Sequence, residues 1–124
     1  MASRSSKPVS PRLHGLIDYG VATADLALPS LLKMSGRARA VFAAFGLAQG
    51  AVNSLTAQPY ALDPLVPLST HRRIDLAAVP VVVALPPLLG LHREPRARAY
   101  WLVLAGSLVA VYLLTDWEAA PTGR

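Results

Sequence analysis

Apolar residues fall into four long stretches separated by short polar segments, at about residues 14–32, 40–56, 74–91 and 99–115. Each stretch approaches the ~20 residues with which an α-helix crosses about 30 Å of hydrocarbon. A helix of a soluble bundle would carry a polar face along its length, and these stretches carry almost none. The pattern therefore predicts an all-α integral membrane protein, a four-helix bundle, in preference to a soluble one.

The four stretches form two copies of one unit. A shift of 57 residues superposes His14 on His71 and Asp18 on Asp75, and a shift of 59 residues superposes Leu55-Thr56 on Leu114-Thr115. Apolar bias alone would not align histidine, aspartate and threonine. Each copy holds two helices, so both copies start on one side of the membrane as parallel repeats. We predict a disordered basic tail (1–12), a first transmembrane hairpin (13–57), a Pro-rich linker (58–69), a second hairpin (70–117) and a C-terminal tail (118–124).

The duplicated unit resembles the SPW repeat of bacterial membrane proteins. The resemblance rests on the duplication, on ALPSLL at 27–32 and ALPPLL at 84–89, and on the Leu-Thr pair that closes each second helix. Only the proline of the Ser-Pro-Trp motif is present, as Pro29 and Pro86. The resemblance implies two pairs of membrane helices in the bacterial plasma membrane, in a family without an assigned activity.

Polar residues repeat at one end of the predicted bundle. His14 lies four residues before Asp18, and His71 four residues before Asp75, so each pair shares one helix face. Because the repeats are parallel, both pairs lie at the same membrane surface. The ends of the second and fourth helices return there and bring Thr56, Thr115 and Asp116. These seven residues form the candidate polar cluster.

Three interpretations of this cluster remain open. In the structural one, which we prefer, the acids bond to the histidines, to Arg72 or Arg73, or to hydroxyls, because an unpaired carboxylate in hydrocarbon costs about 3 kcal/mol. In the second, the cluster carries ions or protons. In the third, two His and two Asp bind zinc or iron. No metalloprotease spacing, glycine-rich loop or cysteine is present, so we expect no catalytic residue, no cofactor and no stoichiometric metal.

Asp25 is the acid that the duplication does not explain, since Val82 takes its place in the second copy. It lies eleven residues beyond His14, hence ~16 Å deeper along a helix and near the bilayer centre. An acid at that depth is a functional candidate by default. The alternative is that it bonds to a neighbour such as Thr23 or Gln49.

Charge distribution indicates a lipid partner. The net charge of +5 could suit nucleic acid, but Lys and Arg cluster at the ends of the apolar stretches, as in proteins that meet lipid headgroups. Six basic residues lie on each side, and those of the hairpin loops are the more compressed, which favours cytoplasmic loops at 33–39 and 92–98. We expect the bilayer, with further copies of the chain or a larger membrane complex, as partners, and a structural or accessory role. The alternatives are a small ion or proton transporter and a membrane metalloprotein.

Three smaller features concern local structure. Ser10 before Pro11 predicts a capped start for the first helix, and Ser69 or Thr70 a cap for the third. Pro80 predicts a kink. The pairs Gly46 with Gly50 and Gly106 with Ala110 predict close helix packing.

Overall fold

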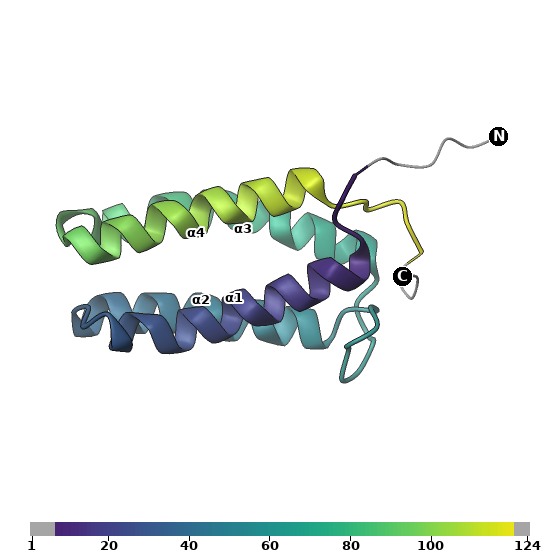
Figure 1. Ribbon diagram of the computed structural model, residues 1–124, viewed down its shortest axis with the longest axis horizontal. Helices are drawn as coiled ribbons and strands as arrows, with labels where there is room; N and C mark the ends of the chain where they lie inside the picture. The colour runs from purple at the N-terminus through teal and green to yellow at the C-terminus, as the bar shows by residue number, and fades with distance from the viewer. Residues whose placement is uncertain (1–6, 121–124) are drawn as a thin grey trace.

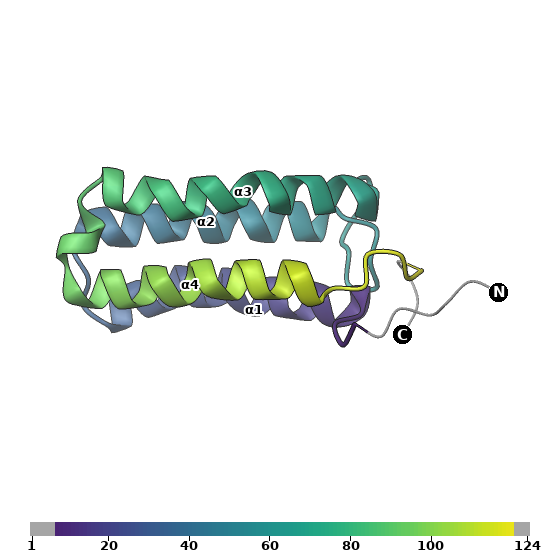
Figure 2. The same ribbon diagram turned by 90° about the horizontal axis from the view of Figure 1, so that it is seen from above.

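Four α-helices form the protein in the computed structural model, which describes residues 7–120 (Figures 1 and 2). The described residues contain no named strand, so the predicted all-α class is confirmed. Positions 1–6 of the expected basic tail and 121–124 of the C-terminal tail lie outside this range. The helices are α1 (Pro11–Leu31), α2 (Gly36–Ser54), α3 (Leu68–Leu88) and α4 (Pro95–Leu114), with a 3₁₀ turn, η1 (Leu91–Arg93), before α4.

The helix starts agree with the capping predictions at α1 and not at α3. Ser10 Oγ accepts the Leu13 N–H, and Pro11 occupies the first turn of α1. Ser69 and Thr70 already lie inside α3, whose N-cap is Pro67 without a side-chain hydrogen bond, so that expectation was wrong. Proline fixes φ at a value that suits the extended N-cap backbone, but it has no side-chain oxygen to accept an N–H of the first turn. α3 is one uninterrupted helix through Pro80.

The helices pair as two hairpins that run in the same direction. Figures 1 and 2 show α1 beside α2 and α3 beside α4, with both hairpin loops at one end and the start of α1 and the end of α4 at the other. The long linker between α2 and α3 lies at the terminal end. The hairpins are therefore parallel in space, as the shift of the sequence on itself predicted.

Glycine brings only the first hairpin into close contact. A Cβ atom on Gly46 would lie 2.8 Å from the Ala22 carbonyl oxygen and from Asp25 Cβ, so α2 touches the backbone of α1 there. A Cβ on Gly106 would meet nothing within 4 Å, so the predicted close packing at that residue is wrong. The hairpins are duplicated in sequence but differ in packing.

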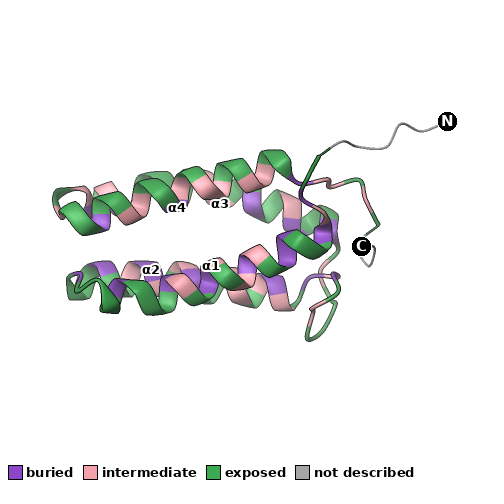
Figure 3. Ribbon diagram, viewed as in Figure 1, coloured by how far each residue is buried: buried purple, intermediate pink, exposed green. Residues whose placement is uncertain are grey.

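The interior is divided into an apolar half and a polar half. Phe42, Leu91 and Ala97 are fully buried towards the hairpin loops. At the terminal end most of the large buried side chains are polar: His14, Asp18, Asn53, Thr56, Gln58, His71, Asp75 and Thr115. Figure 3 shows exposed positions along all four helices, and many of them are large and apolar, such as Leu31 (73% exposed), Leu47 (62%) and Val103 (69%).

Among the described residues, α4 alone combines the length and apolarity of a membrane span, with a mean hydropathy of 1.6. This property is one of length and composition alone. In α1 and α3, Asp18, Asp25 and Asp75 lower the mean hydropathy of helices whose outward side chains remain apolar.

Candidate functional site

The two His-Asp pairs meet face to face between α1 and α3. His14 Nε2 lies 3.3 Å from Asp18 and 3.1 Å from Asp75. His71 Nε2 lies 3.1 Å from Asp18 and 3.2 Å from Asp75. Each imidazole thus contacts both carboxylates, and each carboxylate both imidazoles. We call these four residues the His-Asp quartet; they are at most 9% exposed.

Two threonine hydroxyls bond to the imidazole nitrogens that point away from the quartet, and each threonine belongs to a different repeat from its histidine. His71 Nδ1 lies 2.7 Å from Thr56 Oγ1 at the end of α2, and His14 Nδ1 lies 2.8 Å from Thr115 Oγ1 at the end of α4. Each hydroxyl donates its own proton to a carbonyl one turn earlier, Val52 or Val111. The threonine oxygen must therefore accept an Nδ1–H, and each ring has its Nε2 towards the centre of the quartet.

The chain segments before α1 and α3 fix both threonines in matching ways. Val9 donates its N–H to the Leu114 carbonyl (3.1 Å), and Val66 donates its N–H to the Leu55 carbonyl (2.7 Å). These contacts form two isolated parallel bridges, Val9 with Thr115 and Val66 with Thr56. The end of the expected disordered tail is therefore ordered from Val9. Extending the 57-residue shift back from His14 pairs Val9 with Val66, so the sequence could have predicted that these two segments are equivalent.

Trp117 and Gln58 occupy equivalent positions after the two crossed threonines. Trp117 Nε1 donates to the Tyr112 carbonyl (3.0 Å), and Gln58 Nε2 donates to the Asn53 carbonyl (3.1 Å). The Trp117 ring packs against His14 with a centroid distance of 4.8 Å. The sequence does not predict the equivalence of Gln58 and Trp117, because the two residues share a position and a type of hydrogen bond but differ in residue type.

The remaining polar candidates lie apart from the quartet. The Asp116 carboxylate accepts the backbone N–H of Glu118, while Arg72 pairs with Glu118 at 3.3 Å. The acids of the quartet therefore take histidine as their partner, one of the options left open, and Arg72 is directed to another acid.

The contacts inside the quartet are close but poorly directed for hydrogen bonding. Neither Nε2 atom, nor Asp18 Oδ2, has a partner with hydrogen-bond geometry, although all three are buried. Each Nε2 instead faces the gap between two carboxylate oxygens. One donor atom from each of the four residues lies within 4.8 Å of the others.

This arrangement fits the ligand shell of a small divalent metal ion. With zinc–ligand bonds of about 2.0–2.1 Å, neighbouring ligands of a tetrahedral site lie about 3.3 Å apart. The four His–Asp separations are 3.1–3.3 Å, with Asp75 presenting Oδ2 to His14 and Oδ1 to His71. One ligand atom from each residue lies within 4.8 Å of the others, so the four side chains would draw together slightly around an ion. A metal-bound histidine also needs its second ring nitrogen held by a hydrogen bond, which Thr56 and Thr115 provide.

Asp25 lies deeper in the bundle and has a partner other than those expected. Tyr100 on α4 donates to its Oδ1 at 2.5 Å. Thr23 bonds instead to the Tyr19 carbonyl, and Gln49 donates to Asp18. The second carboxylate oxygen of Asp25 has no hydrogen-bond partner, and the residue is 1% exposed.

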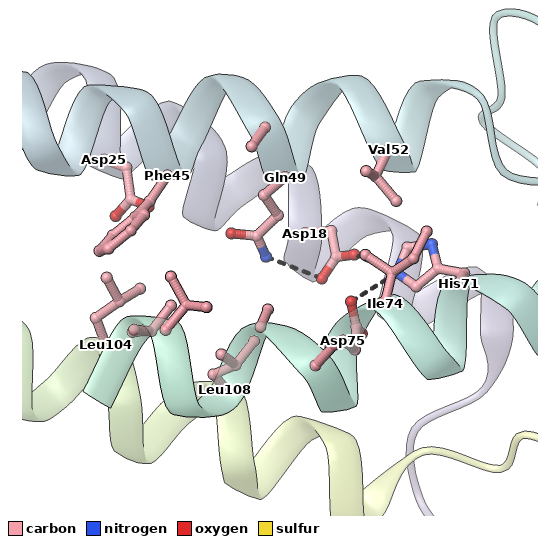
Figure 4. Close-up of a pocket in the computed structure, with 15 residues that line it drawn as sticks. Asp18, Asp25, Phe45, Gln49, Val52, His71, Ile74, Asp75, Leu104 and Leu108 are labelled. Carbon is pink, nitrogen blue, oxygen red and sulfur yellow. Dashed lines mark hydrogen bonds and ion pairs between the residues drawn. The ribbon is translucent and has the colours of Figure 1, made fainter. Parts of the chain in front are cut away.

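A cavity of about 350 Å³ connects Asp25 with the quartet (Figure 4). It lies between α2 and α3, with Asp18, Asp25 and Gln49 among its lining residues. The other walls are mostly apolar, from Phe45 on α2 to Leu108 on α4.

Comparisons with protein-family models, curated proteins and solved structures return no match to this chain. The function is therefore argued from the geometry of the quartet, the cavity and the exposed surface.

Proposed function

We propose that all four helices cross a lipid bilayer. Each has 19–21 residues, which corresponds to about 30 Å of helix and to the thickness of a hydrocarbon core. The strongest support is the distribution of side chains, because large aliphatic residues are exposed while His, Asp, Asn and Thr are buried. In water, an exposed apolar surface of this kind would promote aggregation. In a bilayer, the exposed apolar side chains face the lipid acyl chains, and the buried polar side chains bond to one another inside the bundle.

Within that bilayer protein, we propose that the His-Asp quartet binds one divalent transition-metal ion, with zinc the best fit. The observation that carries this proposal is the position of the two buried Nε2 atoms, each of which lies 3.1–3.3 Å from both carboxylates without meeting the geometry of a directed hydrogen bond. Two neutral imidazoles, two carboxylates and a divalent cation form a neutral unit. Neutralisation matters because isolated buried charges are costly.

The metal would serve as a clamp between the hairpins. α1 supplies His14 and Asp18, and α3 supplies His71 and Asp75, so the ion joins one repeat to the other. Four protein ligands complete a tetrahedral shell, which is typical of structural rather than catalytic zinc. The proposed role is thus a structural or accessory membrane component with a metal-stabilised core. We further propose that the chain is an SPW-repeat-like protein, on the duplication and the ALPSLL and ALPPLL segments of its sequence.

The second candidate is a proton or ion carrier. One observation favours it: Asp18, Gln49 and Asp25 line the same cavity between helices. A carrier would need these groups to exchange protons with both sides of the membrane. Flux into liposomes that is lost in Asp25→Asn, with metal content unchanged, would favour this candidate.

Metal content of the detergent-solubilised protein tests the clamp. We expect about one zinc per chain in the wild type after exposure to zinc and removal of free metal. The His14→Gln, His71→Gln double variant should lose it, because an amide is a poor substitute for imidazole. His92→Gln is the matched control, since His92 lies in η1 at the opposite end of the bundle. A wild type that retains no zinc, iron, manganese or copper after loading would overturn the metal proposal.

A further inference from the structure

The cavity between α2 and α3 is partly open to the outside of the bundle. Ile74 and Val81 form part of its wall and are 36% and 50% exposed, so a molecule could enter between the helices. Figure 4 shows Asp25, Gln49 and Asp18 along the inner wall. The volume of about 350 Å³ is near the lower end of the roughly 300–1,000 Å³ of ligand pockets.

The polar groups available to a ligand in this cavity are hydrogen-bond acceptors. Asp25 Oδ2 is buried and has no partner. Gln49 uses its amide N–H₂ on Asp18 at 3.2 Å, which leaves its carbonyl oxygen as an acceptor. His71 is held by Thr56 through Nδ1 and faces the quartet through Nε2. No Lys or Arg lines the cavity in the described part of the chain.

The equivalent space in the other half of the bundle is nearly filled. Between α1 and α4 the cavity measures about 20 Å³, room for about one water molecule. Val21 stands there in the position of Ala78, and Leu108 in the position of Gln49. The two copies have therefore diverged at these positions: the interface between α2 and α3 is open and carries the Gln49 acceptor, whereas the interface between α1 and α4 is filled. Asp25 likewise occurs in only one copy.

We propose that the larger cavity binds a small lipophilic molecule carrying a protonated amine. Its ammonium group would donate to Asp25 Oδ2 and to the Gln49 carbonyl, and its apolar body would pack between Phe45 and Ala78. A cation complements a buried carboxylate that no basic side chain neutralises. An acyl chain or a carbonyl compound would leave that carboxylate oxygen without a partner. The site borders the quartet, because Asp18, His71 and Asp75 also line the cavity, but the groups that would hold the amine are Asp25 and Gln49.

Binding of 1-adamantylamine to the full-length protein in detergent tests this site, with 1-adamantanol as the uncharged molecule of the same shape. Isothermal titration and thermal unfolding would be measured for both. We expect the amine to bind at least about tenfold more tightly than the alcohol, because the charged hydrogen bond is available only to the amine. Equal affinity of the two probes would overturn the proposal and indicate a cavity that takes any apolar molecule.

Two variants and one control distinguish the contribution of the Asp25 carboxylate to amine binding from that of the cavity volume. Asp25→Asn keeps an acceptor for Tyr100 and removes the charge, so amine binding should fall at least about tenfold. Ala78→Leu keeps Asp25 but fills the cavity, so both probes should be lost. Asp63→Asn, an exposed acid in the linker, should leave binding unchanged. If Asp25→Asn does not fold, Ala78→Leu decides, and undiminished amine binding in it would reject the cavity as the site.

Discussion

Thr56 accepts a hydrogen bond from His71 at 2.7 Å, although the two residues belong to different repeats. Thr115 and His14 repeat this relationship in the opposite sense at 2.8 Å. Each hairpin therefore completes the histidine site of the other. A two-fold exchange of this kind joins the repeats at one end of the bundle, whereas the apolar contacts join them at the other.

Replacing either threonine by valine should loosen its histidine while preserving side-chain shape. Thr56→Val and Thr115→Val should each lower the free energy of unfolding by about 1–3 kcal/mol, because a buried Nδ1–H loses its acceptor. Zinc affinity should fall about 10–100-fold. Thr23→Val is the control, since Thr23 is partly exposed and bonds only to a carbonyl of its own helix. Unequal effects at Thr56 and Thr115 would contradict the exchange symmetry.

Neutralising either acid of the quartet should destabilise the protein. Asp18→Asn and Asp75→Asn should each destabilise the solubilised protein by about 3 kcal/mol or more, since each carboxylate contacts both histidines. The effect at Asp18 should be the larger, because Asp18 also accepts a bond from Gln49 and is 3% exposed against 9% for Asp75. Chemical unfolding in mixed micelles measures both. One neutral and one unfolded variant would show that the quartet is not a shared site.

Asp25 and Tyr100 form a polar pair that the second copy replaces with Val82 and Val41. Tyr100→Phe should cost about 1–3 kcal/mol, because it leaves both carboxylate oxygens of Asp25 without a donor. Adding Asp25→Val to Tyr100→Phe removes the unpaired carboxylate while keeping the aromatic ring against Phe42, and it should restore most of this loss. A double-mutant cycle measures the coupling. Additive losses would show that the two side chains do not interact.

The two glycine environments predict opposite outcomes for the same substitution. Gly46→Ala should destabilise by about 1–3 kcal/mol, because its Cβ would meet the Ala22 carbonyl at 2.8 Å. Gly106→Ala should be neutral or stabilise by up to about 1 kcal/mol, since its Cβ would meet nothing and alanine favours helix. Thermal unfolding of both variants provides the comparison. A harmless Gly46→Ala would mean that α1 and α2 lie farther apart.

Reporter fusions test the four proposed membrane crossings. Reporters after Gly36 and after Arg93 should lie on one side of the membrane, and those after Tyr60 and after Gly123 on the other. We expect the first pair in the cytoplasm, because the basic residues of those loops are the more compressed. All four reporters on one side would refute the crossings, and exchange of the two sides would reverse only the orientation.

The sequence by itself determined the helices, their number and the faces that meet. Apolar stretches of helix length set the elements, and a four-residue spacing placed each histidine above its aspartate. The shift of 57 residues then required both pairs to lie at one end. These features follow from local periodicity and duplication, which act along the chain.

Tertiary structure decided which groups serve as partners and where space remains. Tyr100 reaches Asp25 across 75 residues, and the partners suggested by proximity in sequence bond elsewhere. The crossed threonines, the direction of the Nε2 atoms and the difference between cavities of about 350 and 20 Å³ depend on how two similar hairpins pack. Side chains such as Ala78 and Val21 differ by small volumes. Their effect appears only when four helices enclose a common space, because packing depends on the neighbours of a residue and not on its place in the chain.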